Sequence, residues 1–84
     1  MKFSVIWKPN AERRLADIWM ESTDRKSIAE TADHIDRMLR IDAHERGESR
    51  GGERRVIVQA PLGAIYRVRI DDRVVEVLTV WKFD

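Results

Sequence analysis

Several basic side chains in the second half of the sequence are candidates for chemistry on a phosphate group. RNA cleavage requires a base for the 2′-hydroxyl, a proton donor for the leaving 5′ oxygen, and cations that stabilise the charge developing on phosphate. The candidate cations are Arg54, Arg55, Arg67, Arg69 and Lys82. No general acid and base accompany them in a recognisable pattern. The catalytic residues therefore stay unassigned, and the sequence alone does not decide whether the protein is an enzyme.

These cations also have structural interpretations. In a hairpin register, Arg67 lies opposite Glu76 and can be engaged in a cross-strand ion pair. Arg69 has no carboxylate opposite it in the same register, which leaves it available to a phosphate group or a partner protein. Arg54 and Arg55 alternate across their strand, so at most one of them shares a face with Arg69.

The tyrosine and the histidines are predicted to be structural. Tyr66 shares its predicted strand face with Val68 and Val77, so we expect its ring in the core and its hydroxyl bonded to a partner. His34 and His44 lack metal-ligand spacing, and the sequence contains no cysteine. We therefore expect no metal site and no cofactor.

Two of the candidate cations, Arg67 and Arg69, are positioned by the segment 64–81, AIYRVRIDDRVVEVLTVW. Two runs rich in β-branched and apolar residues flank Asp71 and Asp72, which predicts a tight β-hairpin. A two-residue loop at this point pairs Tyr66 with Val77. Because side chains alternate along a strand, the hairpin has two faces, and both carry apolar residues.

The upstream sequence predicts a short strand and two helices. FSVIW at residues 3–7 is typical of a strand, and Pro9 opens a helix with one apolar stripe. Ser27 and Glu30 have the spacing of a capping box and start a second amphipathic helix. The two helices are therefore expected to form an antiparallel hairpin.

The segment between the helices and the hairpin predicts a loop and one more strand. The glycine-rich, charged residues 44–53 indicate a mobile surface loop, residues 54–60 a strand, and residues 61–63 a turn. The complete order predicts a two-layer α+β fold, β-α-α-β-β-β, with the helical hairpin packed on one face of a small, mainly antiparallel sheet. We expect a single domain spanning residues 1–84.

Composition narrows the class of protein. Sixteen Lys and Arg against fifteen Asp and Glu give a net charge of +1, so any basic surface must be local. No segment approaches the roughly 20 apolar residues of a membrane helix. With no cysteine to form disulfides, these features predict a cytoplasmic protein that does not engage a membrane.

Two helices can cover only one face of the predicted sheet, which leaves apolar side chains on the other. The candidate partner-binding residues are Ile57, Ile65, Leu78, Val80 and Trp81. A contiguous exposed apolar surface usually marks a partner or self-association site, so a partner protein or a homodimer is expected here. The alternatives are that the C-terminal tail or the glycine-rich loop covers this face, or that sheet twist buries it locally.

Over nearly its whole length the sequence resembles the RelE/ParE superfamily of small toxins from bacterial type II toxin–antitoxin modules. VIWKPNAERRLADIW is similar to the family's first strand, proline, alanine and Leu/Ile-rich helix. IYRVRIDDRVVEVLTVWKFD is similar to its tyrosine-bearing strand, acidic turn and closing strand. The resemblance implies a toxin neutralised by a cognate antitoxin, whose C-terminal segment wraps the toxin and covers its sheet.

The resemblance also implies different chemistry for two branches of the superfamily. RelE-like members cleave mRNA on the ribosome, whereas ParE-like members poison DNA gyrase. The RNA-cleaving pattern carries an arginine three residues before the strand tyrosine, a second basic residue after the one that closes the last strand, and a C-terminal tyrosine. Here Gly63 and Phe83 occupy the first two positions, and Asp84 ends the sequence before any such tyrosine. Lys82 matches the family's closing basic residue.

The sequence therefore leaves several functions open. The first is a toxin that acts by gyrase poisoning or by inhibiting translation at the ribosome. The second is a non-toxic binding module of the same fold. The third is a ribonuclease, either ribosome-dependent with altered catalytic residues or acting alone.

Overall fold

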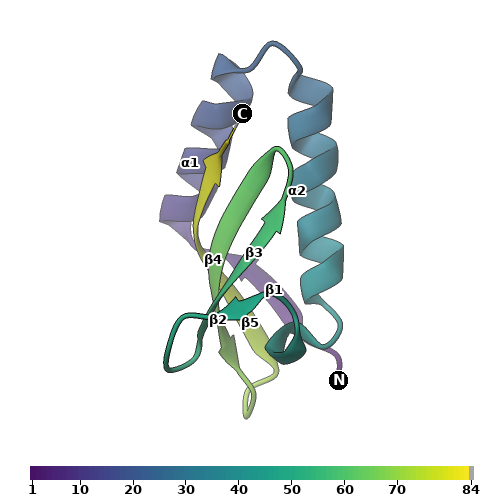
Figure 1. Ribbon diagram of the computed structural model, residues 1–84, viewed down its shortest axis with the longest axis vertical. Helices are drawn as coiled ribbons and strands as arrows, with labels where there is room; N and C mark the ends of the chain where they lie inside the picture. Colours follow the sequence, from purple (N-terminus) through teal and green to yellow (C-terminus); the bar gives the residue numbers. More distant parts are fainter. Residues whose placement is uncertain (84) are drawn as a thin grey trace.

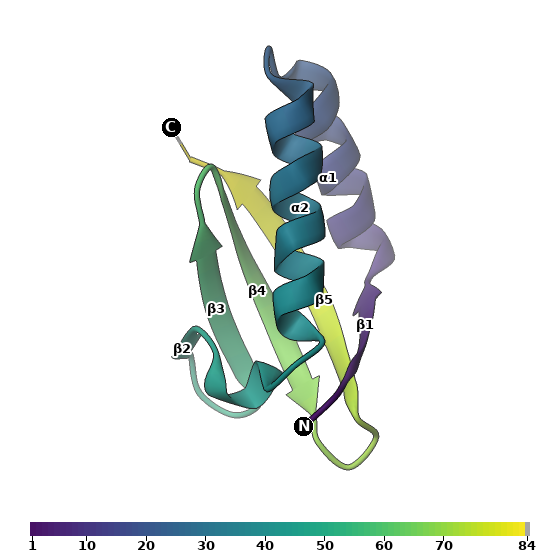
Figure 2. The ribbon, with the colours of Figure 1, turned by 90° about the vertical axis from the view of Figure 1, so that its right-hand side faces the viewer.

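The helices and strands form two layers, with both helices on the same side of one sheet (Figures 1 and 2). The computed structural model describes residues 1–83. In chain order the elements are β1 (Ser4–Trp7), α1 (Pro9–Glu21), α2 (Arg25–Leu39), the 3-10 turn η1 (Ala43–Glu45), β2 (Glu48–Ser49), β3 (Arg54–Gln59), β4 (Leu62–Arg69) and β5 (Val74–Lys82). The predicted α+β class and the placement of the helical hairpin are confirmed.

The sheet is mixed, with strand order β1-β5-β4-β3-β2. β1 runs parallel to β5 at one edge, and the other neighbours are antiparallel. The predicted hairpin register is confirmed near the turn, where Tyr66 pairs with Val77 and Arg67 with Glu76. Arg73 N–H donates to the carbonyl of Ile70 at 3.1 Å and closes the turn around the two aspartates.

The helix boundaries follow local capping chemistry. Pro9 is the first residue of α1, where its missing N–H costs nothing. α2 starts two residues before Ser27, because Asp24 is the N-cap and its carboxylate accepts a hydrogen bond from the Ser27 N–H at 3.1 Å. The prediction of Ser27 as the capping residue is therefore wrong. Among the described residues no helix is both long and apolar enough to cross a membrane.

A β-bulge in β5 changes which side chains face the helices. The register shifts between Ile65 and Tyr66, so that Ile65 pairs with Thr79 and Leu78 is left as the extra residue. Beyond this point each side chain of β5 points to the face opposite to the one it would occupy in a regular strand. Val80, which is 1% exposed, therefore turns toward the helices. The prediction that Val80 faces away from them is wrong for this reason.

Ile57 also lies on the helix-covered face. It pairs with the fully buried Ala64 and is 4% exposed. The prediction that it points to the opposite face is wrong, because strand alternation places its neighbours Val56 and Val58 there instead.

Tyr66 is buried in the core, as predicted, and lies beneath the connection between α2 and β3. Its hydroxyl lies 3.0 Å from the carbonyl oxygen of Ala43 and 2.7 Å from that of Arg46. Burial raises the pKa of this phenol, so the hydroxyl keeps its proton and can donate. The connection that was predicted to be a mobile loop is therefore partly ordered, with η1 and the short strand β2 within it.

Candidate functional site

The face of the sheet turned away from the helices, which we call the open face, carries two kinds of side chain. Cross-strand pairing aligns Arg54, Arg67, Glu76 and Ile6 in one row toward the β4–β5 turn. The rows toward the other end of the sheet are largely apolar and are built from Val56, Ile65, Val58 and Trp81. The open face thus has a charged half and an apolar half.

The charged half is built around the carboxylate of Glu76, which is 7% exposed. Arg67 donates from Nε and Nη2 to its Oε1 at 3.0 and 2.7 Å. Lys8 Nζ lies 3.6 Å from Oε2, and Arg69 Nη1 lies 3.8 Å from Oε1. We call these residues the Glu76 cluster. It holds more cations than carboxylates and therefore carries a net positive charge.

The cluster favours the ionised form of its carboxylate. Hydrogen bonds from Arg67 lower the pKa of Glu76, and the charges of Lys8 and Arg69 act in the same direction against the cost of burial. A row of like charges in a sheet would repel without such a counter-ion. Glu76 therefore stabilises a concentration of cations that is otherwise unfavourable.

Arg54 is a cation of the open face that lies outside the Glu76 cluster. It lies directly opposite Arg67 in the register of β3 and β4. It is exposed and takes part in none of the ion pairs found among residues 1–83. A phosphate or carboxylate group from another molecule would satisfy both this guanidinium and the local excess of positive charge.

The apolar half is centred on Trp81. A Cβ atom on Gly63 would lie 2.5 Å from Cζ2 and 2.6 Å from Cε2 of the indole, so the ring lies directly over this glycine. Ile65 and Leu78 are half-buried, and neither packs against the core cluster. Val58 is 59% exposed. The predictions that Ile65 and Leu78 lie away from the helix-covered core agree with this arrangement. Trp81, a candidate for partner binding, also lies on the open face, because the bulge reverses its orientation.

The remaining predicted cations lie elsewhere. Arg55 is on the helix-covered side, where its Nε donates to the Arg46 carbonyl at 2.5 Å and its Nη2 to that of Gly47 at 3.1 Å. β5 ends at the opposite end of the sheet from the β4–β5 turn (Figure 1). Lys82, its last residue, therefore lies apart from the Glu76 cluster, and it borders a hollow beside the α1–α2 connection. The structure therefore brings together Arg54, Arg67 and Arg69, and leaves Arg55 and Lys82 apart from them.

Sequence reasoning missed Lys8 and the central role of Glu76. It also left Arg69 without a carboxylate, whereas Arg69 Nε lies 3.5 Å from Asp72 Oδ2 in addition to its contact with Glu76. Alternation along β1 places Lys8 on the same side as Ile6. Only the parallel pairing of β1 with β5 shows that this side lies next to Glu76. In the described part of the chain no group of three or more His, Cys, Asp or Glu side chains has the geometry of a metal site.

The fold and the open face define a small two-layer α+β domain with a candidate binding surface on its sheet. The chain belongs to the ParE toxin family: the family model described as "ParE toxin of type II toxin-antitoxin system, parDE" matches residues 5–82. Among curated protein sequences none matches the chain significantly.

Solved structures with the same fold include both branches of the superfamily. The RelBE2 toxin–antitoxin complex from Mycobacterium tuberculosis aligns with a TM-score of 0.79 at 14% identity, over 98% of this chain and 92% of that chain. The chromosomal ParDE system from P. aeruginosa aligns with a TM-score of 0.75 at 15% identity, over 99% and 98%. The intact E. coli RelBE complex aligns with a TM-score of 0.53 at 21% identity, over 100% and 99%. These likenesses establish the fold.

Proposed function

We propose that this protein is the growth-inhibiting component of a type II toxin–antitoxin module and that a cognate antitoxin holds it inactive in the cytoplasm. Membership of the ParE toxin family supports the type of module. An antitoxin partner is supported by the M. tuberculosis and E. coli relatives, which are described as toxin–antitoxin complexes. It is further supported by the open face, whose apolar half has no covering element among residues 1–83.

The proposed mode of toxicity is binding to a protein target, DNA gyrase, without RNA cleavage. The observation that carries this proposal is the Trp81 ring over Gly63. The RNA-cleaving pattern has an arginine at this position, and any side chain there would collide with the indole. Arg67, on the same strand as Gly63, is held by Glu76.

In the described part of the chain the open face carries no histidine or tyrosine, and its Glu76 carboxylate is held by Arg67. Of the histidines and the tyrosine in residues 1–83, Tyr66 is buried on the other face and His34 and His44 lie in α2 and η1. Trp and Arg side chains are instead common at the energetic centres of protein–protein interfaces. Trp81 in the apolar half and Arg54 in the charged half of the same face support protein binding.

Inducible expression in a bacterium that lacks the antitoxin gene tests the proposal. Growth, protein synthesis and DNA supercoiling are followed together. We expect growth arrest with loss of gyrase activity while early protein synthesis continues. Early loss of translation would contradict the gyrase mode, and undisturbed growth of cells that contain folded protein would favour a non-toxic binding module.

Variants of the open face test which surface is responsible. Arg54→Ala and Trp81→Ala are expected to relieve arrest, because they remove the unpaired cation and the aromatic ring. Arg14→Ala, at an exposed position of α1, is the matched control and should leave toxicity unchanged. Thermal unfolding of each purified variant separates loss of binding from loss of folding. Equal toxicity in all variants would exclude the open face as the surface that binds the target.

A further inference from the structure

Arg54 occupies a crowded position in the charged half of the open face, because its neighbours on both sides are arginines. In the sheet it lies opposite Arg67 of β4. On its other side the N–H of Arg50, the residue that follows β2, donates to the Arg54 carbonyl at 2.9 Å. Like charges that lie directly opposite each other in a sheet are destabilising. A counter-charge beside Arg54 would therefore stabilise this part of the surface.

Each arginine beside Arg54 already has a carboxylate of its own. Glu76 accepts hydrogen bonds from Nε and Nη2 of Arg67 at 3.0 and 2.7 Å. Glu48 Oε2 lies 3.4 Å from Nη1 of Arg50. Arg54 itself takes part in none of the ion pairs found among residues 1–83. The counter-charge for Arg54 must therefore come from another molecule.

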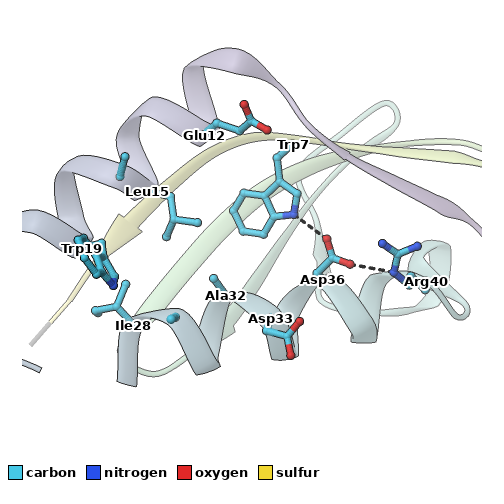
Figure 3. Close-up of a pocket in the computed structure, with 11 residues that line it drawn as sticks. Trp7, Glu12, Leu15, Trp19, Ile28, Ala32, Asp33, Asp36 and Arg40 are labelled. Atoms are coloured by element: carbon cyan, nitrogen blue, oxygen red, sulfur yellow. Dashed lines mark hydrogen bonds and ion pairs between the residues drawn. The ribbon is translucent and has the colours of Figure 1, made fainter. Parts of the chain in front are cut away.

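A groove of about 700 Å³ between α1 and α2, by contrast, holds its cation in an internal ion pair (Figure 3). Arg40 Nε donates to Asp36 Oδ1 at 2.8 Å, and the Trp7 indole donates to Oδ2 of the same carboxylate at 2.9 Å. Trp19, which is 41% exposed, also lines this groove, and the Arg25 guanidinium lies 4.6 Å from its ring centroid. An acidic ligand would therefore have to displace Asp36 to bind Arg40, whereas Arg54 is free to bind it.

Arg54 also lies at a fixed spacing from the apolar half of the open face. Arg54, Val56 and Val58 are alternate residues of β3, so their side chains share this face at steps of about 7 Å. Val58 pairs with Gly63, which in turn pairs with Trp81, so this row lies about 13 Å from Arg54. One face of the indole covers Gly63, and the other is turned away from the sheet. A ligand that lies along the strands can thus reach the guanidinium and the indole together.

We infer that the open face binds an extended segment of the protein target, and that this segment carries an acidic side chain four residues away from a large apolar one. The inference rests on the proposed function, in which the open face binds a protein target, and it names the chemistry of the part that is bound. Side chains on one face of an extended segment also repeat about every 7 Å, which matches the spacing along β3.

Each part of such a segment has a place on the open face. The carboxylate binds the Arg54 guanidinium through charge-assisted hydrogen bonds. The side chain two residues further on lies over Val56 and Ile65, and the large apolar side chain lies on the Trp81 indole. A phosphate backbone would satisfy Arg54 alone, whereas this segment satisfies both halves of the face.

An NMR titration of the isotope-labelled full chain with peptides tests the inference. The probes are peptides of about nine residues, which extend over about 30 Å. Their core is Glu-Thr-Val-Thr-Phe or the reverse order, because a segment can run in either direction along the strands, and matched peptides carry Gln in place of Glu. We expect at least one Glu peptide to shift the indole N–H signal of Trp81 and to bind about tenfold more tightly than its Gln counterpart.

Variants of the two halves locate the contacts. Arg54→Gln is expected to reduce the preference for the Glu peptide over the Gln peptide to about twofold or less, because it removes the cation that binds the carboxylate. Arg14→Gln makes the same charge change at an exposed position of α1 and should leave the preference unchanged. Trp81→Ala, followed at the backbone amides of β4, should weaken both peptides about tenfold and keep the preference. Thermal unfolding of each variant verifies that it is folded.

Four results would overturn the inference. No Glu peptide binds at concentrations up to about 1 mM, the Glu and Gln peptides bind equally, the preference persists in Arg54→Gln, or a DNA or RNA oligonucleotide binds the charged half more tightly than the Glu peptide. None of these results depends on toxicity. If one of them occurred while Arg54→Ala and Trp81→Ala still relieved growth arrest, the proposed function would stand and only the chemistry of the bound segment would be wrong. Conversely, early loss of translation would contradict the gyrase mode without changing the peptide preference.

Discussion

The two faces of the sheet are formed by alternate residues of the same strands, yet they are held by different forces. Tyr66, Val75 and Val77 turn toward the helices and are fully buried. Their neighbours Arg67 and Glu76 turn the other way and form an ion pair. Adjacent positions in β4 and β5 therefore contribute either to folding or to the candidate binding surface.

The two forces differ in size. Full burial of an aliphatic or aromatic side chain contributes about 1.5–3 kcal/mol, whereas an ion pair at a partly exposed site contributes about 1 kcal/mol or less. Substitutions on the helix-covered face should therefore reduce stability most. Substitutions on the open face should mainly change what the protein binds.

The largest expected effect on stability tests the bulge in β5, which turns Val80 into the core. Val80→Ala should lower the free energy of unfolding by about 2 kcal/mol, because Val80 lies in the core. Leu78→Ala should cost about 1 kcal/mol or less, because Leu78 is half-buried outside the core cluster. Urea unfolding of both variants measures the difference. A regular strand without the bulge would place both side chains on the open face, and the two variants would then have similar, small costs.

An intermediate effect is expected at the centre of the Glu76 cluster. Glu76→Gln should lower stability by about 1 kcal/mol at neutral pH, because Arg67, Lys8 and Arg69 lose their counter-charge. The folded pKa of Glu76 lies below its ordinary value of 4.5. Its ion pairs therefore stabilise the fold above that value, and this contribution is lost as the pH falls through the folded pKa.

Urea midpoints measured between pH 7 and pH 3 test this pH dependence. The acid-induced loss of stability should be smaller in Glu76→Gln than in the wild type, because glutamine does not titrate. Leu62→Ala removes a buried side chain remote from the cluster and should lower stability equally at every pH. Identical pH profiles for Glu76→Gln and the wild type would show that the cluster does not contribute.

The smallest expected effect on stability concerns Gly63. Gly63→Ala places a Cβ atom within 2.6 Å of the Trp81 indole, so the ring must move away from the sheet. Because Trp81 is on the open face, the cost should be about 1 kcal/mol or less. Trp81 fluorescence should shift to longer wavelength in a background without the other tryptophans. An unchanged spectrum would mean that the ring does not lie over this glycine.

Much of the fold could be predicted because its signals are local. The alternation around Asp71 and Asp72 predicted the hairpin, the pairing of Arg67 with Glu76 and the burial of Tyr66. Helical periodicity predicted both helices and the layer that they form. The resemblance to the RelE/ParE superfamily, which rests on the same segments, was confirmed by the match to the ParE family.

The candidate site was predicted less completely. The bulge at Leu78 reversed the expected orientation of Val80, and no residue type in that stretch signals an extra residue. Lys8 joins Glu76 only because β1 is parallel to β5. The exposure of Trp19 depends on the separation of the helices, which hydrophobic periodicity does not specify.

By itself the sequence determined both helices, the longer strands, the hairpin register near the turn and the family, because turn chemistry and hydrophobic periodicity act between residues close in the chain. The tertiary structure decided which faces are covered, which cations gather around Glu76 and where a groove remains between the helices. These features depend on contacts between segments far apart in the chain. A single bulge or the direction of one edge strand changes such contacts without changing any local pattern.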